Sequence, residues 1–441
     1  MHKIMVKVKE YAEMTKDKLM LYTFVALLVL VGVSYISFGL TSLIAAAIAV
    51  LVAVGIDLFI SKVAADAKPN MMSAAVFGLI VALSYSLGLP AMRSIEALSL
   101  LAPDAYFFVA AISAIGVTLF KKLSGRKRVN PAAAAKILVL LPFLDSMLLA
   151  KDHLVDGMLG VPSLAGPIGY DILGNNGVAS FASYIQTCFA DPAATVATTV
   201  TQSEMLQLLL FQKWHGWVGG VSSIAVIAVG IALFVLARKY IKWRITVSYL
   251  VTIAVMALAL GFVFGDANPL LRVLFHLFIG SSIFMAFFMA TDPATTPVTY
   301  LGQLIFGAGL AVLTILIQTY MGFLGGSILA LIVMNLTTPF LDKVGMQKPT
   351  TEKQEVKLPK GKQFADAKVT DCIRCGVCMR TCCHKLSPIL IKEAFDGQKV
   401  EKLLKLNPDY CDGCGHCNFV CPARIDLKGS VLRSKAFLKG Q

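Results

Sequence analysis

Cys-Ile-Arg-Cys-Gly-Val-Cys-Met-Arg-Thr-Cys at 372–382 and Cys-Asp-Gly-Cys-Gly-His-Cys-Asn-Phe-Val-Cys-Pro at 411–422 decide the fold of the C-terminal part of this chain. Both runs have the spacing Cys-x2-Cys-x2-Cys-x3-Cys. This spacing is typical of [4Fe-4S] ligands, because three close cysteines supply most of one cluster's thiolates and the fourth crosses to the other cluster. The sequence therefore predicts two [4Fe-4S] clusters in a small α+β, dicluster ferredoxin-like module.

We expect the eight cysteines of the two runs to divide into two metal-binding sets. The first set is Cys372, Cys375, Cys378 and Cys421, and the second is Cys411, Cys414, Cys417 and Cys382. Cys383 stands where a proline would be usual, so it is either a spare thiol or an alternative fourth ligand. His416 is expected to tune a cluster rather than bind it. A zinc module is the alternative, but zinc sites usually offer separate Cys-x2-Cys pairs.

The composition of the whole chain is that of an integral membrane protein. Hydrophobic residues make up 57% of it and charged residues 15%, with a mean hydropathy of +0.74. Ten apolar stretches come near the ~20 residues that span a bilayer: 20–38, 42–60, 70–88, 103–120, 134–149, 216–237, 246–264, 272–290, 300–318 and 325–341. The predicted fold is an all-α polytopic membrane protein with about ten transmembrane helices, of which the fifth is short and contains Asp145.

The order of apolar and polar segments divides the chain into four parts. These are an N-terminal cytoplasmic segment at 1–19, a transmembrane domain at 20–341, a linker at 342–368 and the ferredoxin-like module at 369–441. Pro349, Pro359 and Gly361 give the linker its composition.

The distribution of Lys and Arg orients the predicted bundle. If Met1 starts inside, the inward segments hold 17 of the 40 basic residues, the outward ones hold 4, and 19 follow residue 341. This bias predicts a multi-pass protein of the cytoplasmic (inner) membrane with both termini cytoplasmic. The cluster cysteines would then lie in a reducing compartment. The net charge of +14 follows largely from the same bias, so we do not interpret it as nucleic-acid binding.

Several motifs of the membrane region resemble one known family. They are Phe-Phe-Met-Ala-Thr-Asp-Pro-Ala-Thr-Thr-Pro at 287–297, Gly-Gln-Leu-Ile-Phe-Gly-Ala-Gly at 302–309, Lys-Trp-Arg-Ile at 242–245, Val-Asn-Pro-Ala at 129–132 and Met-Asn at 334–335. The region resembles the membrane flavoprotein family that contains the D subunit of Rnf complexes and the B subunit of sodium-pumping NADH:quinone oxidoreductases. The C-terminal module is similar to the double-cluster segment of the Rnf C subunit, so the chain looks like a fusion of the two.

The resemblance implies two flavins. One is FMN, joined through its phosphate to a threonine of a Ser-Gly-Ala-Thr motif in an outward loop. Here that loop is 150–213, and its nearest match is Thr-Val-Ala-Thr at 195–198, so Thr198 is the expected attachment site and Thr195 the alternative. The motif is degraded, and a β-prone polar stretch would give the same letters. The second is riboflavin or another non-covalent flavin near the inward side, where Asn130 and Asp292 are placed to bind it, although Asn-Pro and Asp-Pro also start helices.

The function implied is electron transfer in a membrane complex. The expected partners are other Rnf- or Nqr-like subunits, among them an outward FMN-carrying subunit and small membrane subunits, and ferredoxin or another cytoplasmic electron donor. The sequence has no Walker motif and no NAD fingerprint, so the chain is not expected to oxidise a nicotinamide. Two alternatives stay open: a permease or channel with a redox-sensing iron–sulfur tail, and a quinone or extracellular electron-transfer subunit that pumps no ion.

Polar residues within the apolar stretches are costly in hydrocarbon and tend to face a cavity or a partner. The set comprises Asp57, Asp145, His276, Gln303, Gln318 and Asn335. We expect Asp57 to reach the membrane interface and His276 to be a satisfied packing residue.

Overall fold

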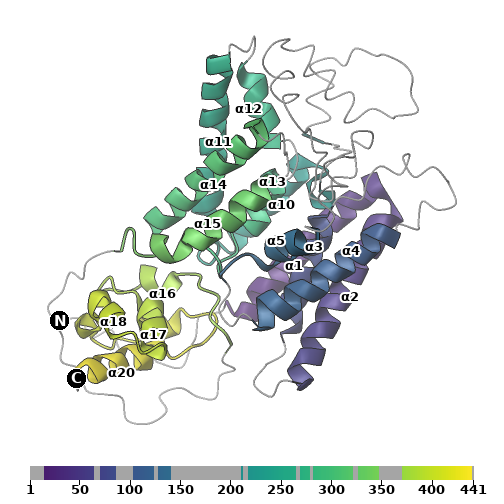
Figure 1. Ribbon diagram of the computed structural model, residues 1–441. Helices are drawn as coiled ribbons and strands as arrows, with labels where there is room; N and C mark the ends of the chain where they lie inside the picture. The colour runs from purple at the N-terminus through teal and green to yellow at the C-terminus, as the bar shows by residue number, and fades with distance from the viewer. Residues whose placement is uncertain are drawn as a thin grey trace, which may run out of the picture.

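Helices and turns make up the computed structural model (Figure 1). It describes residues 14–63, 70–85, 103–123, 128–140, 210–211, 217–264, 269–278, 282–320, 326–346 and 370–439. Within these ranges there is no strand. The helices form three groups: α1 to α5 (purple to blue), α10 to α15 (teal to green), and the C-terminal group α16 to α20 (yellow).

The first two groups form what we call the membrane body. Its helices are α1 (Lys16–Phe38), α2 (Leu40–Val63), α3 (Met71–Leu83), α4 (Pro103–Ile115) with the π-helix η3 (Gly116–Leu123), α5 (Pro131–Leu140), α10 (Ser223–Leu236), α11 (Trp243–Phe264), α12 (Pro269–Phe278), α13 (Ser282–Phe284) with the π-helix η6 (Met285–Met289), α14 (Tyr300–Tyr320) and α15 (Ser327–Leu341). The short 3-10 turn η5 (Val218–Gly220) precedes α10.

Membrane-spanning capacity is clear for part of this body. Among the described residues, α1, α2, α11 and α14 are long and apolar enough to cross a bilayer, and α12 with α13–η6 forms a further pair bent by 60°. These helices support a polytopic membrane protein. The predicted count of ten spans stays a prediction, because residues 141–149 of the fifth stretch and the loop 150–209 lie outside the described residues.

Close helix contacts in the membrane body occur at small residues. A Cβ added to Gly78 of α3 would lie 2.6 Å from the carbonyl oxygen of Ala49 in α2, and one added to Gly307 of α14 would lie 2.5 Å from that of Ile245 in α11. Only glycine permits these backbone approaches, as is common where helices pack in a bilayer.

Polar side chains fix where these helices begin. The Thr15 hydroxyl accepts the backbone N–H of Lys18 at the start of α1, and the Asn70 side chain accepts that of Ser73 at the start of α3. The buried Asp57 carboxylate in turn accepts the backbone N–H of Asn70, at 2.8 Å. Asp57 therefore binds the backbone at the start of α3 rather than merely reaching the membrane interface.

The C-terminal group, which we call the cysteine module, is an internal repeat with an offset of 39 residues. Its helices are α16 (Val377–Arg380), α17 (Pro388–Asp396), α18 (Val400–Leu406), the 3-10 turn η7 (Pro408–Tyr410), α19 (His416–Phe419) and α20 (Leu427–Lys439). The starts of α16 and α17 correspond to those of α19 and α20. Left-handed backbone recurs at the same offset, at Gly376 and Gly415 before the two short helices.

The α+β character expected of the module is not seen in residues 370–439, and the ferredoxin-like assignment stays a prediction. The segments that flank the two cysteine runs meet through a backbone hydrogen bond of 3.0 Å from Thr370 to Ala423. This single backbone hydrogen bond does not make a strand ladder.

Candidate functional site

The eight predicted ligand cysteines lie together in the module, and we keep the two predicted groups to describe them: Cys372, Cys375, Cys378 and Cys421, then Cys411, Cys414, Cys417 and Cys382. Cys378 interacts electrostatically with every other member of the first group and also with Cys417, and Cys417 interacts with every other member of the second group. We call the first group the membrane-side set and the second the solvent-side set. Cys375, Cys378 and Cys421 of the membrane-side set are buried, whereas every member of the solvent-side set is partly or fully exposed.

A hollow with about 370 Å³ of empty space, including its opening to solvent, lies among the solvent-side cysteines. Its lining includes all four of them and His416. Burial raises the pKa of the Cys411 thiol to about 11 and, in the membrane-side set, raises the pKa of the Cys378 thiol. Thiols of this kind must lose their protons to bind a metal. Converging cysteines around a hollow fit an iron–sulfur cluster in donor chemistry.

Cys383 lies beside the solvent-side set. Its Sγ atom is 3.8 Å from that of Cys414, and the exposed Asp412 carboxylate joins the two thiols in a group with metal-binding spacing. His384 Nε2 lies 2.9 Å from the same carboxylate. Both interpretations of Cys383 given above remain compatible with this position.

An ion pair joins the cysteine module to the membrane body. Arg374 Nη2 lies 2.5 Å from Asp342 Oδ2, and Arg374 Nη1 lies 2.7 Å from Glu393 Oε1 within the module. The Arg374 and Asp342 side chains are 6% and 7% exposed. Asp342, directly after α15, also accepts the backbone N–H of Val298 at 3.0 Å. A buried pair of this kind fixes position, because removing either partner leaves the other charge uncompensated.

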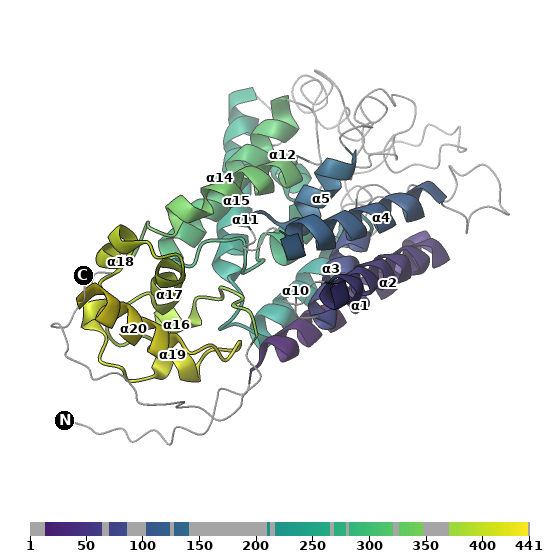
Figure 2. The same ribbon diagram turned by 60° about the horizontal axis from the view of Figure 1, so that its bottom comes forward.

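Further polar contacts lie at the same junction. Arg380 donates one hydrogen bond to the Cys375 carbonyl at 3.0 Å and another to the Lys239 carbonyl of the membrane body. The backbone N–H of Lys16, at the start of α1, donates to the Pro422 carbonyl at 3.1 Å. Figure 2 shows the resulting arrangement, with α16 and α19 next to the start of α1 and the turn after α10.

Apolar side chains also pack at this junction. Leu19, Ala237 and Tyr240 of the membrane body form one buried cluster with Ile373, Cys375 and Val377 of the module. Val298 packs with Cys378 in a second cluster. Burial raises the pKa of Tyr240, and the nearby Cys375 and Cys421 raise it further. The membrane-side set therefore lies against the membrane body.

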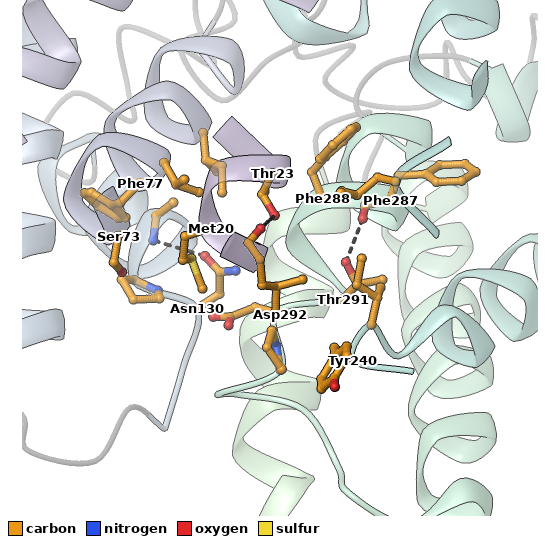
Figure 3. Close-up of a pocket in the computed structure, with 18 of the residues that line it drawn as sticks. Met20, Thr23, Ser73, Phe77, Asn130, Tyr240, Phe287, Phe288, Thr291 and Asp292 are labelled. Atoms are coloured by element: carbon orange, nitrogen blue, oxygen red, sulfur yellow. Dashed lines mark hydrogen bonds between the residues drawn. The ribbon is translucent and has the colours of Figure 1, made fainter. Parts of the chain in front are cut away.

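A cavity opens in the membrane body at the end where the module docks (Figure 3). It has about 860 Å³ of empty space, including the part open to solvent. Residues of α1, α3, η3, α5 and α10, the turn before α11 and five residues between 287 and 293 line it. Its walls are largely apolar, with Phe77, Phe287 and Phe288 prominent, and Lys121, Asn130 and Asp292 add polar groups.

The two predicted flavin residues, Asn130 and Asp292, lie side by side in this cavity (Figure 3). Asn130 Oδ1 accepts the backbone N–H of Ala132 at 3.0 Å, and Asn130 Nδ2 donates to the Met289 carbonyl at 3.2 Å. Asp292 Oδ1 accepts the backbone N–H of Ala294 at 3.1 Å. Both residues therefore perform helix-start or turn chemistry, and each still presents a polar edge to the cavity.

Lys242 holds the loop that contains Asp292. Its ammonium donates to the Pro293 carbonyl at 2.8 Å, the Thr296 carbonyl at 2.7 Å and the Thr296 hydroxyl at 3.0 Å. Burial lowers the pKa of Lys242 to about 7, with a smaller contribution from the positive charge of Arg374. This lysine links the cavity wall to the surface on which the module docks.

The polar residues within the apolar helices have varied environments. His276 Nδ1 lies 2.8 Å from Gln318 Oε1, in agreement with a packing role. Gln303 donates to the Pro297 and Val298 carbonyls. Asn335 is fully buried, and neither polar atom of its side chain has a hydrogen-bond partner in the described structure.

The position of Lys136 corrects one part of the Lys and Arg count, which placed this residue in an inward segment. It is buried within α5, donates to the Ser84 carbonyl and lies 4.5 Å from the ring centroid of Trp217. The count missed this position because the six residues after Asn130 already carry the helix into the protein interior.

The predicted sites of covalent FMN attachment, Thr198 and Thr195, lie outside the described residues, as does Asp145. The site residues that the sequence did not single out are Lys242, Tyr240 and Arg374. Lys242 and Arg374 lie in motifs that resemble known families, and this resemblance was the one sequence feature that could have pointed to them.

The comparisons with known proteins agree with this membrane body. A Cronobacter sakazakii protein is 41% identical over 110 residues, which cover 25% of this chain and 31% of that protein. A Pectobacterium atrosepticum protein is 34% identical over 158 residues, covering 35% and 44%, and a Salmonella newport protein is 42% identical over 109, covering 25% and 30%. Each is named as the D subunit of an ion-translocating oxidoreductase complex. The chain thus spans less than half the length of these relatives.

The family comparison covers much more of the sequence. Residues 8–351 match the family described as NQR2, RnfD, RnfE. The match includes every helix of the membrane body and ends before the cysteine module. Because it covers most of the chain, the family of the membrane body is settled: this chain belongs to the NQR2, RnfD, RnfE family.

Proposed function

We propose that this chain is a D-type electron-transfer subunit of an ion-translocating oxidoreductase complex, with a built-in pair of iron–sulfur clusters. Family membership supports the first part, because the relatives described above carry that name. The cysteine module, which we take to be related to the Rnf C subunit, supports the second. The observation that carries the proposal is that the paired cysteine sets are packed on the same end of the membrane body as the cavity.

The membrane-side set would bind one [4Fe-4S] cluster and the solvent-side set the other. The ligands of the first are Cys372, Cys375, Cys378 and Cys421, and those of the second are Cys411, Cys414, Cys417 and Cys382. The burial of Cys375, Cys378 and Cys421 and the hollow among the cysteines of the second set support this division. Such clusters carry single electrons.

The cavity would bind a non-covalent flavin. Its aromatic and aliphatic walls suit a flat ring, and its few polar groups suit the ring's hydrogen-bonding edge. Asp292 and the second amide hydrogen of Asn130 are available to that edge, and Lys121 adds positive charge to the same cavity. A bound flavin accepts and gives electrons, while the protein positions the ring and sets its electrostatic surroundings.

A second flavin, FMN, would be attached to Thr198 by a phosphoester, with Thr195 as the alternative. This part of the proposal rests on the family membership of the membrane body and on the threonines of loop 150–213. A covalent hydroxyl linkage holds the ring without using a protein thiol.

The assembly and its location follow from the same reasoning. We place the chain in the cytoplasmic membrane with both termini and the cysteine module on the cytoplasmic side, as the distribution of Lys and Arg predicts. Its partners would be other subunits of an Rnf- or Nqr-like complex, including an outward FMN-carrying subunit and small membrane subunits. Ferredoxin or another cytoplasmic donor would deliver electrons.

Cofactor analysis of anaerobically purified protein tests the proposal. We expect about eight irons and eight acid-labile sulfides per chain, which is the content of two [4Fe-4S] clusters, and flavin in the same sample. Cys414→Ala should remove about half of the iron and leave the flavin. Stoichiometric zinc without sulfide contradicts the cluster assignment, and iron without flavin favours a redox-sensing permease over an electron-transfer role.

A further inference from the structure

The two halves of the cysteine module differ at the positions that face the membrane body. The repeat pairs Arg374 with Gly413 and Arg380 with Phe419. Arg374 and Gly413 both have left-handed backbone, with φ of 52° and 76°. Glycine adopts this conformation without strain, whereas the Cβ of an arginine crowds the backbone there. The first half therefore keeps a strained arginine where the second half has the relaxed residue.

The strained arginine is explained by what its side chain contacts. Arg374 forms the buried ion pair with Asp342 of the membrane body, and Arg380 donates to the Lys239 carbonyl. Gly376, between them, approaches the membrane body so closely that an added Cβ would lie 3.2 Å from the Val298 carbonyl. The backbone strain at Arg374 is thus coupled to docking.

The second half of the module has the opposite character. Gly413 carries no side chain at the position equivalent to Arg374, and Phe419, equivalent to Arg380, is 37% exposed. Cys414 is exposed, as are Asp412 and His416 around it. At these two positions this half has no arginine, and its Cys411, Cys414 and Cys417 are partly or fully exposed, whereas its Cys421 is buried.

Two side chains of the membrane body belong to both the docking surface and the cavity. Leu19 and Tyr240 line the cavity and also belong to the buried cluster that contains Cys375. This cluster therefore connects Cys375 of the membrane-side set to the cavity wall. The solvent-side set has no counterpart to this contact among the described residues.

We propose that Arg374 and Arg380 dock the module in a single orientation, with the membrane-side cysteines against the cavity wall at Tyr240 and the solvent-side cysteines open to a soluble redox protein. The inference rests on the proposed function, since it concerns the positions of the two clusters. The inference adds the order of the two clusters to the proposed function. A soluble partner reaches the solvent-side set, and the membrane-side set lies next to the cavity.

The test measures how fast a soluble, bulky iron chelator removes iron from the full-length protein in detergent. Wild-type protein should release iron in two phases of equal size, and Cys414→Ala, which removes the solvent-side cluster, should retain only the slow phase. Arg374→Gly relieves the backbone strain and removes the docking side chain, so the module should still fold. We expect it to accelerate the slow phase by roughly tenfold or more, because a buried ion pair is lost.

A matched variant separates docking from backbone strain. Lys385 has the same left-handed backbone, with φ of 56°, but its side chain is exposed, so Lys385→Gly should leave both phases unchanged. Asp342→Ala, on the other side of the junction, should reproduce the effect of Arg374→Gly. A single release phase in wild-type protein, unchanged phases in Arg374→Gly, or equal acceleration in Lys385→Gly each overturns the inference. Iron and sulfide content, measured first, reveals separately whether the proposed function has failed.

Discussion

Replacing Lys242 with methionine should destabilise the protein by an amount that grows with pH. Methionine has similar length but donates no hydrogen bond, so the carbonyls of Pro293 and Thr296 lose their donor. Each buried acceptor left unpaired costs about 1–3 kcal/mol. Against this, the substitution removes an ammonium group that is only 2% exposed, and burial of such a charge is itself unfavourable.

The sign of the pH dependence follows from the two pKa values of Lys242. It is about 7 in the folded protein, against 10.5 for an ordinary lysine. Between these values the unfolded chain binds more protons, so wild-type stability rises with pH by up to ~1.4 kcal/mol per pH unit. Below pH 7 Lys242 is protonated in both the folded and the unfolded state, so it no longer makes wild-type stability depend on pH. Bound clusters would move the window upward through their negative charge but would not reverse its sign.

The measurement is the free energy of unfolding in detergent at pH 6, 7.5 and 9, from guanidinium titrations followed by tryptophan fluorescence. We expect Lys242→Met to be less stable than wild type by about 2–4 kcal/mol at pH 9, and we expect this difference to be about 3 kcal/mol smaller at pH 6. Other titrating groups cancel in the difference between the two proteins. A difference that stays constant, or that shrinks as pH rises, refutes the reasoning.

Three further predictions concern packing, flavin attachment and topology. Gly78→Val should lower the melting temperature, because its Cβ would lie 2.6 Å from a carbonyl oxygen of α2 and overpacking costs roughly 1–3 kcal/mol, whereas Gly55→Ala, with open space around it, should not. Thr198→Ala should abolish the flavin fluorescence of the denatured chain and Thr195→Ala should keep it; an unmodified mass for loop 150–213 from native-host protein contradicts both. A tag after Gln441 should resist protease added to intact cells, and its cleavage would reverse the predicted orientation.

The sequence predicted the chemistry of the site better than its assembly. Cysteine spacing reflects local turns, so it was enough to predict that the thiols lie together, and Cys378 and Cys417 each interact with three or more of the other predicted ligands. The division into two ligand sets stays a prediction. Asn130 and Asp292 were each placed at the inward side by motif and predicted span, and both line the cavity; their binding of a flavin stays a prediction.

Contacts between distant segments were beyond sequence reasoning. Nothing local indicates that Arg374 pairs with Asp342, since 32 residues separate them and the contact depends on how the module docks. Tyr240 gave no signal, because an aromatic residue in a turn between apolar helices is ordinary. Lys136 was misplaced because charge counting treats every lysine near a predicted span end as solvated, whereas its side chain contacts Ser84 and Trp217. The strands expected in the module depended on fold analogy rather than on residue pattern.

The presence of the module and the membrane body in one chain changes what the junction between them has to achieve. Residues 347–369 join the two parts in one chain, so the Arg374–Asp342 contact forms within a molecule rather than between two. Tethering of this kind gives an effective concentration on the order of millimolar. A junction of lower intrinsic affinity then suffices to keep the module docked than if the module were a separate protein, and the stoichiometry of module to membrane body is fixed at synthesis.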